Sequence, residues 1–320
     1  MSWLVTGGAG YIGAHVVRAL GDAGLEPVVL DDLSTGRESF VPAGVPFVRS
    51  SILDGAAVSR AIEDHGVTGV IHVAGFKYAG VSVQRPMHTY TQNVTGMAVL
   101  LGVMADCGVE RIVFSSSAAV YGAPNVDLVT EQSPCAPTSP YGESKLVGEW
   151  LLRDQAVAVG LRHTCLRYFN VVGSGDPGVF DASPHNLFPM VFDALIAGET
   201  PRIFGNDYPT PDGTNVRDYV HVSDLARSHV AAARRLEAGE PLEPAYNLGS
   251  GTGVSVAEIM TAIGDVTGIE FAPIVAPRRP GDPARIVANG DLAARDIDWG
   301  MRHSLRDTVE SAWRARLAAQ

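Results

Sequence analysis

A tyrosine and a lysine stand four residues apart in the segment Tyr141-Gly142-Glu143-Ser144-Lys145. On a helix, residues at this spacing share a face, so the phenol and the ammonium can lie close together. A phenol with an ordinary pKa of about 10 is a poor base at neutral pH. A nearby ammonium favours the phenolate and typically lowers that pKa by about 1–3 pH units. The pair therefore predicts a general acid/base, with an ordinary amphipathic helix as the alternative.

Three consecutive serines, Ser115 to Ser117, follow an apolar run and precede Ala118 and Ala119. In a doubly wound sheet, ligands bind at the carboxyl ends of the strands. A hydroxyl at that edge can hold the substrate oxygen that Tyr141 deprotonates. Ser117 is our candidate for this role, and a serine that caps a turn is the alternative.

Glycines follow the first apolar run in the pattern Gly7-x-x-Gly10-x-x-Gly13. They allow a tight turn, a close approach of the backbone to a pyrophosphate, and a helix whose N-terminus attracts anions. The pattern alone also fits a simple strand–helix turn. Asp31, at the end of the second expected strand, can accept from ribose hydroxyls and repel a 2′-phosphate. Together they predict NAD, rather than NADP, as the cofactor.

Short apolar runs rich in Val, Ile and Leu alternate with helical patterns in the first half of the chain. Such runs are typical of strands covered on both faces. The expected strands are Trp3–Thr6, Pro27–Asp31, Val45–Arg49, Gly69–Val73, Arg111–Ser115 and Thr164–Tyr168. The expected helices are Tyr11–Ala23, Gly55–His65, Met87–Cys107 and Tyr141–Val159. The alternation predicts an α/β fold with a Rossmann-type doubly wound parallel sheet.

The alternation ends after Tyr168, where a segment rich in Gly, Pro, Asn and Asp begins. That segment has one helical stretch near Met190–Ala197. A strand-like piece, Arg217–Val222, then leads into a helix near Val222–Leu236. We expect residues 1–170 to form the NAD-binding Rossmann domain, with 217–250 returning to it. Residues 171–216 and 251–320 would form a smaller C-terminal domain that binds the substrate.

The composition narrows the functional classes. The chain has 320 residues and a formal net charge of −11, without a basic run, which disfavours partners such as nucleic acids and anionic membranes. Its three cysteines show no Cys-x-x-Cys spacing, which indicates reduced thiols and a cytoplasmic protein. We expect no metal site, because the nine histidines show no zinc-ligand spacing. Neither a signal peptide nor a membrane span is expected.

Taken together, these motifs resemble the extended short-chain dehydrogenase/reductase superfamily, and within it the UDP-glucose 4-epimerase (UDP-galactose 4-epimerase) family. The resemblance extends to about residue 300, and its most specific part is Ile203–Thr210. It rests on the segments Val5–Gly13, Phe114–Gly122, Ser139–Lys145, Leu166–Asn170, Ile203–Thr210 and Gly213–Val222.

The resemblance implies an isomerase in which NAD is retained rather than consumed. Tyr141 would take the proton of the sugar 4-hydroxyl while the hydride at C4 passes to NAD⁺. The 4-keto sugar would then rotate, and NADH would return the hydride to its other face. The resemblance also implies a homodimer, in which the helices Met87–Cys107 and Tyr141–Val159 pair across a two-fold axis.

The resemblance assigns roles residue by residue. The implied catalytic residues are Ser117, Tyr141 and Lys145. Expected NAD contacts are Gly7, Gly10, Tyr11, Ile12, Gly13, Asp31, Asp32, Leu33, Ser34, Thr35, Gly36, Ser51, Ile52, Val73, Ala74, Gly75, Lys77, Asn93, Ser115, Tyr141, Lys145, Tyr168 and Phe169. Expected contacts with the UDP-sugar are Ser117, Asn170, Asn186, Leu187, Ile203, Phe204, Arg217, Tyr219, Arg279 and Asp282. Among these, Arg217 and Arg279 can clamp the pyrophosphate.

Three positions depart from the family pattern. Ser51 replaces an aspartate that contacts adenine, and Ala119 replaces a threonine that often helps to hold the substrate. Ile286 stands where the family controls the space around the sugar 2-substituent. Its size is intermediate, so UDP-N-acetylglucosamine 4-epimerase activity stays open as an alternative.

Two other functions compete with epimerisation. A nucleotide-sugar 4,6-dehydratase or decarboxylase needs an additional acid near Ser117, where this chain has Ala118 and Ala119. A non-catalytic NAD-sensing protein would be expected to lose the Tyr141 and Lys145 pair, which is present.

Overall fold

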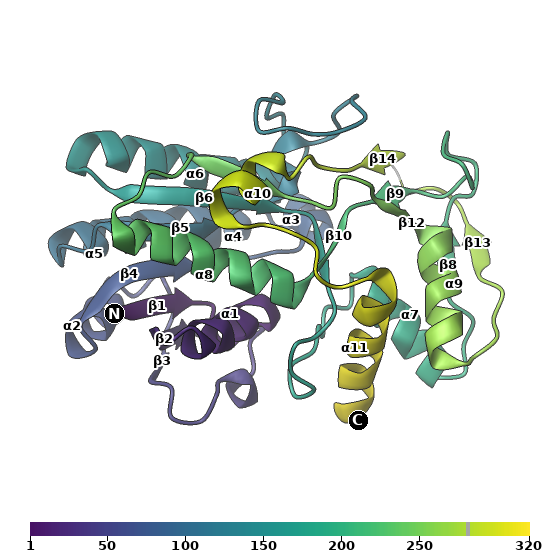
Figure 1. Ribbon diagram of the computed structural model, residues 1–320, viewed down its shortest axis with the longest axis horizontal. Coiled ribbons are helices and arrows are strands. Elements are labelled where there is room, and N and C mark those ends of the chain that lie inside the picture. Colours follow the sequence, from purple (N-terminus) through teal and green to yellow (C-terminus); the bar gives the residue numbers. More distant parts are fainter. Residues whose placement is uncertain (280–281) are drawn as a thin grey trace.

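A seven-stranded parallel sheet forms the centre of the computed structural model, which describes residues 1–279 and 282–320 (Figure 1). The strand order is β11-β6-β5-β4-β1-β2-β3. From β1 the chain builds the sheet towards one edge with β2 and β3, and then towards the other edge with β4, β5, β6 and β11. The order therefore reverses between the neighbouring strands β1 and β4. The predicted Rossmann-type fold is therefore confirmed. The strands are β1 (Ser2–Thr6), β2 (Glu26–Asp31), β3 (Phe47–Arg49), β4 (Val67–His72), β5 (Arg111–Ser115), β6 (Arg162–Tyr168) and β11 (Ala245–Leu248).

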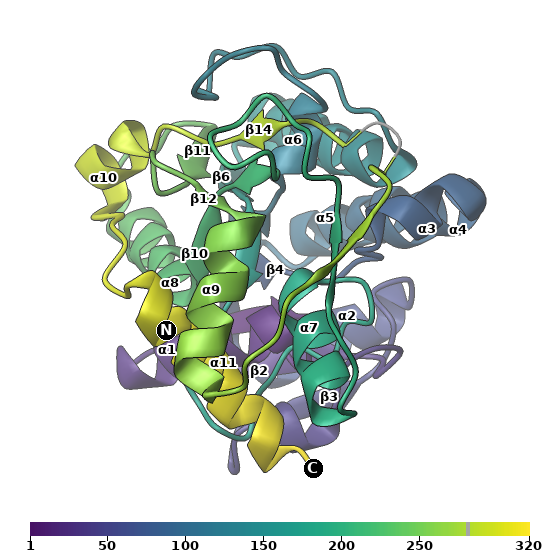
Figure 2. The same cartoon turned by 90° about the vertical axis from the view of Figure 1, so that its right-hand side faces the viewer.

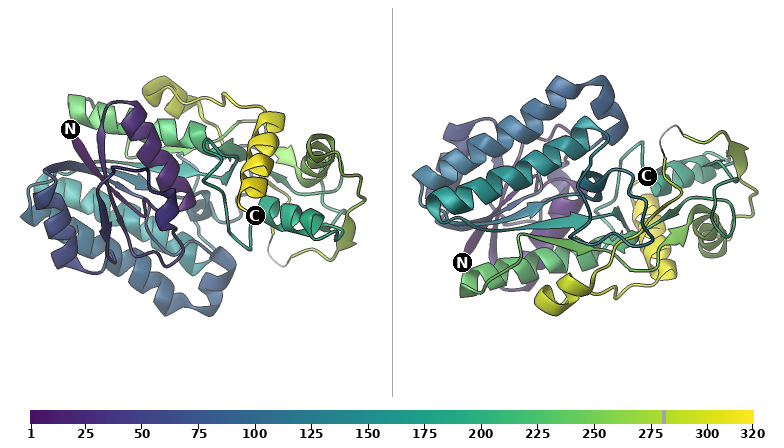
Figure 3. Two further views of the ribbon diagram at one scale, coloured as in Figure 1. Left: turned by 90° about the horizontal axis from the view of Figure 1, so that it is seen from below. Right: turned by 90° about the horizontal axis from the view of Figure 1, so that it is seen from above.

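Helices cover both faces of this sheet (Figure 3). On one face, α1 (Tyr11–Asp22) and α8 (Val222–Ala238) pack against buried side chains such as Val5 and Ile71. On the other face, α2 (Gly55–Asp64), α5 (Gly96–Asp106) and α6 (Pro140–Val159) cover Leu4, Val70 and Ile112. Burial on both faces explains why the strands are apolar runs without alternation.

The helix expected over Met87–Cys107 is confirmed, but it is not regular. It consists of α4 (Pro86–Tyr90), a π-helical turn at Thr91–Thr95 and then α5. A short helix that the sequence did not predict, α3 (Ala79–Gln84), precedes it. A π-helical turn inside an α-helix is frequent at functional sites, and here it carries Asn93.

The smaller unit lies at the end of the molecule that faces the viewer in Figure 2. Its core is shared by three helices, α7 (Leu187–Ile196), α9 (Val256–Thr267) and α11 (Leu305–Ala318). Short strands complete it: β8 (Arg202–Phe204) pairs with β13 (Ile274–Ala276), and β9 (Val216–Arg217) lies between β12 (Val254–Ser255) and β14 (Arg285–Ile286).

Part of the C-terminal region packs against the first unit, which the sequence did not predict. The helix α10 (Asp291–Ile297) places Ala293 and Ile297 in the core of the sheet face that carries α1 and α8. The sequence-based division puts all of 251–320 in the second domain. The apolar side chains of α10, together with Trp299, are buried against the first unit instead.

The strand predicted over Arg217–Val222 is wrong, because two strands in different sheets occupy this stretch. After β9, the chain bends at Asp218 into β10 (Tyr219–His221), which pairs with β7 (Asn170–Val172). The Asp218 carboxylate is fully buried and accepts from the backbone N–H groups of Ser250 and Ala288, at 2.7 and 3.1 Å. A buried carboxylate needs such hydrogen-bond partners, and these two donors hold Asp218 at the break between β9 and β10.

Four buried histidines make the fold sensitive to acid. Burial lowers the pKa of His72 to about 3 and those of His15, His221 and His229 to about 4. An unfolded chain binds protons on these rings below a pKa of about 6.5, whereas the folded chain does not. Their contribution to stability is therefore complete above about pH 6.5 and is lost as the pH falls towards 4.

The His229→Gln variant tests this account. His229 Nε2 lies 2.8 Å from Ser115 Oγ and its Nδ1 lies 2.9 Å from the Leu225 carbonyl oxygen. Removing one buried imidazole should flatten the fall in unfolding free energy between pH 6.5 and 4 by up to about 1.4 kcal/mol per pH unit. Urea denaturation at several pH values measures it, with the exposed His65→Gln as control. An unchanged slope would show that His229 is not neutral in the folded state.

Candidate active site

A cavity of about 800 Å³ runs along the carboxyl edge of the sheet, at the point where the strand order reverses. Its walls come from both units: Gly7 and Asp31 belong to the first, and Asn186, Phe204 and Arg217 to the second. The size suits small-molecule sites, and the place is where open parallel sheets bind ligands.

The glycine loop forms one wall and is closed tightly on itself. A Cβ at Gly13 would lie 2.1 Å from the Gly7 carbonyl oxygen, so no larger residue fits there. Gly7 also has a positive φ of 73°, which favours glycine. The helix α1 starts after Gly10 without a side-chain cap, so the N–H groups of its first turn are left for a ligand. This cradle fits the pyrophosphate of a dinucleotide.

Asp31 closes the same end of the cavity at the last position of β2. Its Oδ2 accepts from the Ala9 N–H at 3.0 Å and its Oδ1 from the Leu33 N–H at 2.8 Å. Burial raises the pKa of Asp31, and these two backbone donors oppose that rise. Each oxygen keeps a second lone pair, so the fixed carboxylate can still accept from ribose hydroxyls.

Tyr141 stands in the first turn of α6, at the other end of the cavity. Ser139 caps this helix by accepting from the Gly142 N–H, and Pro140 occupies its first turn. Burial raises the pKa of the Tyr141 phenol, and a hydrogen bond with the Ser117 hydroxyl opposes that rise. The sequence predicted that Lys145 would lower this pKa, but desolvation is the largest effect on it and raises it.

Lys145 lies one turn further along α6 and is fully buried. Its Nζ donates to the Ser115 carbonyl oxygen at 2.8 Å and lies 5.9 Å from the centre of the Tyr141 ring. Burial lowers the pKa of Lys145 to about 8, and the charge of Glu149 opposes this. The ammonium is therefore still mostly protonated at neutral pH, and it links the helix to the end of β5.

A network around Asn93 holds the loop after β4 against α6. Its Oδ1 accepts from the Phe76 N–H at 2.6 Å, and its Nδ2 donates to Ser144 Oγ at 2.8 Å. Ser144 in turn donates to the Tyr141 carbonyl oxygen at 2.7 Å. Asn93 does not line the cavity, although the sequence predicted an NAD contact. Its observed contacts position the residues that do line it.

Cationic side chains gather at the cavity although the whole chain is acidic. Arg279 stacks on Phe204, with its guanidinium carbon 4.0 Å from the ring centre. Arg217 is paired with Asp282 and donates to the Pro283 carbonyl oxygen at 2.7 Å. A phosphate clamped by Arg217 would therefore compete with a carboxylate. The cations that line the cavity are Lys77, Arg85, Lys145, Arg202, Arg217 and Arg279.

Most residues predicted from the sequence do line this cavity. The exceptions among the expected contacts are Leu33, Gly36, Ser51, Asn93, Ser115 and Ser117. Ser115 is buried with its hydroxyl on His229, and Ser51 accepts from the Leu53 N–H. Ser117 reaches the site through Tyr141. Ile286, expected near the sugar, packs instead against the cluster around Val120 and Tyr121.

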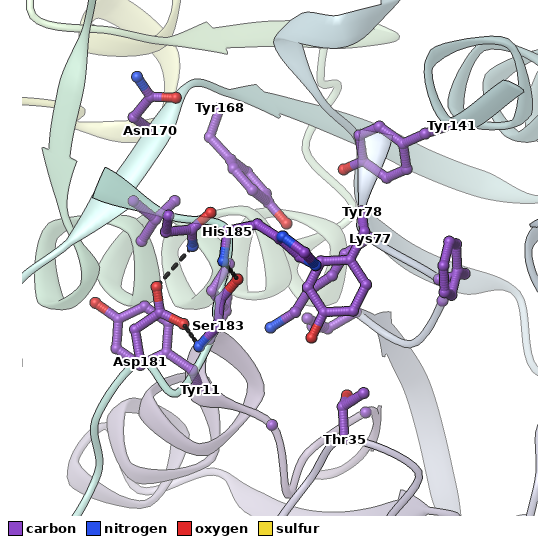
Figure 4. Close-up of a pocket in the computed structure, with 18 of the residues that line it drawn as sticks. Tyr11, Thr35, Lys77, Tyr78, Tyr141, Tyr168, Asn170, Asp181, Ser183 and His185 are labelled. Atoms are coloured by element: carbon purple, nitrogen blue, oxygen red, sulfur yellow. Dashed lines mark hydrogen bonds between the residues drawn. The ribbon is translucent and has the colours of Figure 1, made fainter. Parts of the chain in front are cut away.

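Sequence reasoning missed a group of cavity residues on two loops. One loop follows β4 and carries Tyr78, and the other precedes α7 and carries Asp181, Ser183 and His185 (Figure 4). In the sequence, the only indication of their role is that Tyr78 is next to Lys77 and His185 is next to Asn186, which were predicted to contact ligands. Further lining residues that were not predicted are Leu30, Ser50, Phe76, Arg85, His88, Gln92, Val171, Val172, Phe188, Arg202, Asn215 and Val256.

Comparison with known proteins agrees with this geometry. Residues 3–249 match the family model described as the NAD dependent epimerase/dehydratase family. The chain belongs to this family. It is 44% identical to a UDP-glucose 4-epimerase from Azospirillum brasilense, over 96% of this chain and 89% of that protein.

Solved structures of family members have the same fold. A crystal structure of a UDP-glucose 4-epimerase superposes with a TM-score of 0.95 at 40% identity, covering 99% of this chain and 98% of that one. A second, from Stenotrophomonas maltophila with bound NAD and formylated UDP-arabinopyranose, has a TM-score of 0.94 at 37% identity. The coverage is 100% of this chain and 98% of the other. NAD is the cofactor, and the glycine cradle and Asp31 fit it.

Proposed function

We propose that this chain interconverts UDP-galactose and UDP-glucose by inverting the configuration at C4 of the sugar. The observation that carries the proposal is the place of Tyr141. One cavity holds a dinucleotide cradle at one end and, at the other, the Tyr141 phenol with the Ser117 hydroxyl as partner and the Lys145 ammonium 5.9 Å from its ring centre. The names of relatives that cover almost the whole chain support the same substrate.

The phenol supplies the proton chemistry. Bound NAD⁺ supplies a hydride acceptor and a positive charge, and that charge favours the phenolate of Tyr141. Ser117 is a hydrogen-bond partner of the phenol and would also hold the sugar oxygen. Lys145 adds a fixed positive charge beside the ring. Tyr141 then accepts the proton of the 4-hydroxyl and later returns it, so one residue serves both half-reactions.

The second unit is proposed to hold the nucleotide part of the substrate. Phe204 and Arg279 form a stacked pair beside Arg217, and Asn186 stands at the start of α7. Guanidinium groups suit the pyrophosphate, and the aromatic face suits an apolar or planar ligand group. The residues proposed for this role are Asn170, Asn186, Leu187, Ile203, Phe204, Arg217, Tyr219, Arg279 and Asp282.

Epimerisation is favoured over dehydration or decarboxylation by the residues beside Ser117. Ala118 and Ala119 start the 3₁₀ turn Ala118–Tyr121 and carry no acid. A reaction that ends with only a stereocentre changed needs no second acid/base group.

We propose a cytoplasmic location for the protein. Its cysteines Cys107, Cys135 and Cys165 are free thiols, which is typical of proteins in a reducing compartment.

The Tyr141→Phe variant tests the catalytic assignment. Removing the hydroxyl should leave NAD bound but lower turnover of UDP-galactose by about 10²- to 10⁴-fold, the usual contribution of a general acid/base. A coupled assay for UDP-glucose measures turnover, and the absorbance of released cofactor measures occupancy. Near-normal turnover would show that the proton acceptor is another group. Formation of a 4-keto-6-deoxy sugar or of CO₂ by the parent would contradict epimerisation itself.

We also propose that the chain forms a homodimer through the helices that follow β4 and β5. Apolar side chains are exposed there: Val83 on α3 and Met87 on α4 are 61% and 73% exposed, and Trp150 and Val157 on α6 are 47% and 86% exposed. Large apolar side chains exposed on neighbouring helices favour an interaction surface there.

Light scattering of a Trp150→Glu/Val157→Glu double variant tests the dimer. The parent should have twice the mass of the 33.7 kDa chain, and the variant should have the single mass while it still binds NAD. Thr261→Glu, at an exposed position on α9 of the second unit, serves as a control for added charge. If the parent protein had the mass of one chain, the dimer proposal would be wrong.

A further inference from the structure

Two rings from separate units meet across the cavity. Tyr78 belongs to the loop after β4, and His185 to the loop before α7. Their ring centres lie 5.0 Å apart at an interplanar angle of 74°, an edge-to-face contact. Figure 4 shows the two rings facing each other, with Tyr141 and Tyr168 on one side in that view and Tyr11 and Thr35 on the other.

The loop that carries His185 is built to hold its shape. The Asp181 carboxylate accepts from the Ser183 N–H at 3.0 Å and from Asn186 Nδ2 at 2.6 Å. The backbone N–H of His185 donates to Ser183 Oγ at 3.3 Å. The His185 ring is thus presented by a closed turn that has internal partners for its polar groups.

The loop that carries Tyr78 is equally supported. The Tyr78 ring packs edge-to-face on Phe76, at 5.6 Å and 85°, and Lys77 Nζ lies 5.6 Å from its centre. Phe76 is held by Asn93 through hydrogen bonds to both its N–H and its carbonyl oxygen. The contact between the rings therefore joins two ordered loops of different units, and a change in their separation must break it.

We propose that Tyr78 and His185 form an aromatic clasp that closes over bound NAD and slows its release. Both rings line the cavity, and Figure 4 shows them between Tyr141 on one side and Thr35 on the other. A dinucleotide that reaches from Asp31 to Tyr141 would pass this contact. Tyr78 is half-buried whereas His185 is exposed, so the histidine forms the outer part of the clasp.

Retention of the cofactor has a chemical reason in the proposed reaction. NAD would supply the hydride acceptor for C4 and, once reduced, the hydride donor, so it has to stay bound between the two half-reactions. If the reduced cofactor escaped at that stage, a 4-keto sugar and an enzyme without oxidant would remain. The clasp would lower the rate of such losses without contacting the reacting atoms.

The experiment measures the dissociation of labelled NAD from the holoenzyme after a chase with unlabelled NAD, without sugar. Tyr78→Ala and His185→Ala should each speed release by at least about three-fold, the size expected for one aromatic pair. The double variant should release NAD no faster than the faster single variant, because both changes break one contact. Tyr78→Phe keeps the ring and should release NAD at the rate of the parent.

Three outcomes would overturn the clasp. One is release at the parent rate in both alanine variants, and another is independent, multiplying effects in the double variant. The third is a raised KM for UDP-galactose with unchanged NAD release, which would place the rings over the sugar nucleotide. If Tyr78→Ala does not fold, His185→Ala carries the test, since its side chain is exposed. NAD release is measured without substrate, so failure of the clasp does not depend on the proposed reaction.

Discussion

The buried ammonium of Lys145 is the interaction on which the site depends. A charge without water is costly, and burial lowers the pKa of this group to about 8 even though the Glu149 charge opposes it. Two features keep it charged: its Nζ donates a hydrogen bond to the Ser115 carbonyl oxygen at 2.8 Å, and the Glu149 carboxylate, one turn further along α6, raises its pKa. Satisfying Lys145 thus fixes α6 against the end of β5. Tyr141, one turn earlier on α6, is placed at the carboxyl edge of the sheet as a consequence.

A second buried charge supports the same helix and was not foreseen. Glu149 forms an ion pair with Arg167 on β6 and also accepts from Ser116 Oγ at 2.5 Å. Arg167 donates to the hydroxyl of Tyr121 at 2.7 Å. These contacts satisfy the groups that burial would otherwise penalise. The serine run after β5 therefore serves three tasks, since Ser115 holds Lys145, Ser116 holds Glu149 and Ser117 faces Tyr141.

Features that follow from local pattern could be predicted from the sequence. The strands β1 to β6 and the helices α1, α2 and α6 were placed within about two residues, because burial on both faces gives apolar runs and the glycine spacing marks a turn. The seventh strand of the central sheet, β11, was not predicted. The split at Asp218 could not be predicted, because it depends on amides supplied by Ser250 and Ala288. Tyr78 and His185 were missed for the same reason: their meeting is a contact between distant loops.

Tyr141 and Arg217 would both respond to charge on a bound ligand. Burial raises the pKa of Tyr141, and Arg217 is paired with Asp282. A positive charge beside Tyr141 would favour its phenolate, and a substrate phosphate would compete with Asp282 for Arg217. The chemistry then requires one acid/base group and one hydride carrier, which together invert C4 and leave no net oxidation.

The fate of the hydrogen at C4 tests this account most directly. UDP-galactose that carries deuterium at C4 would be converted in ordinary water, and the product examined by NMR spectroscopy. The account predicts UDP-glucose with the deuterium still at C4, since the same nicotinamide takes and returns it. Loss of the deuterium to solvent, or its appearance at C6, would contradict the account.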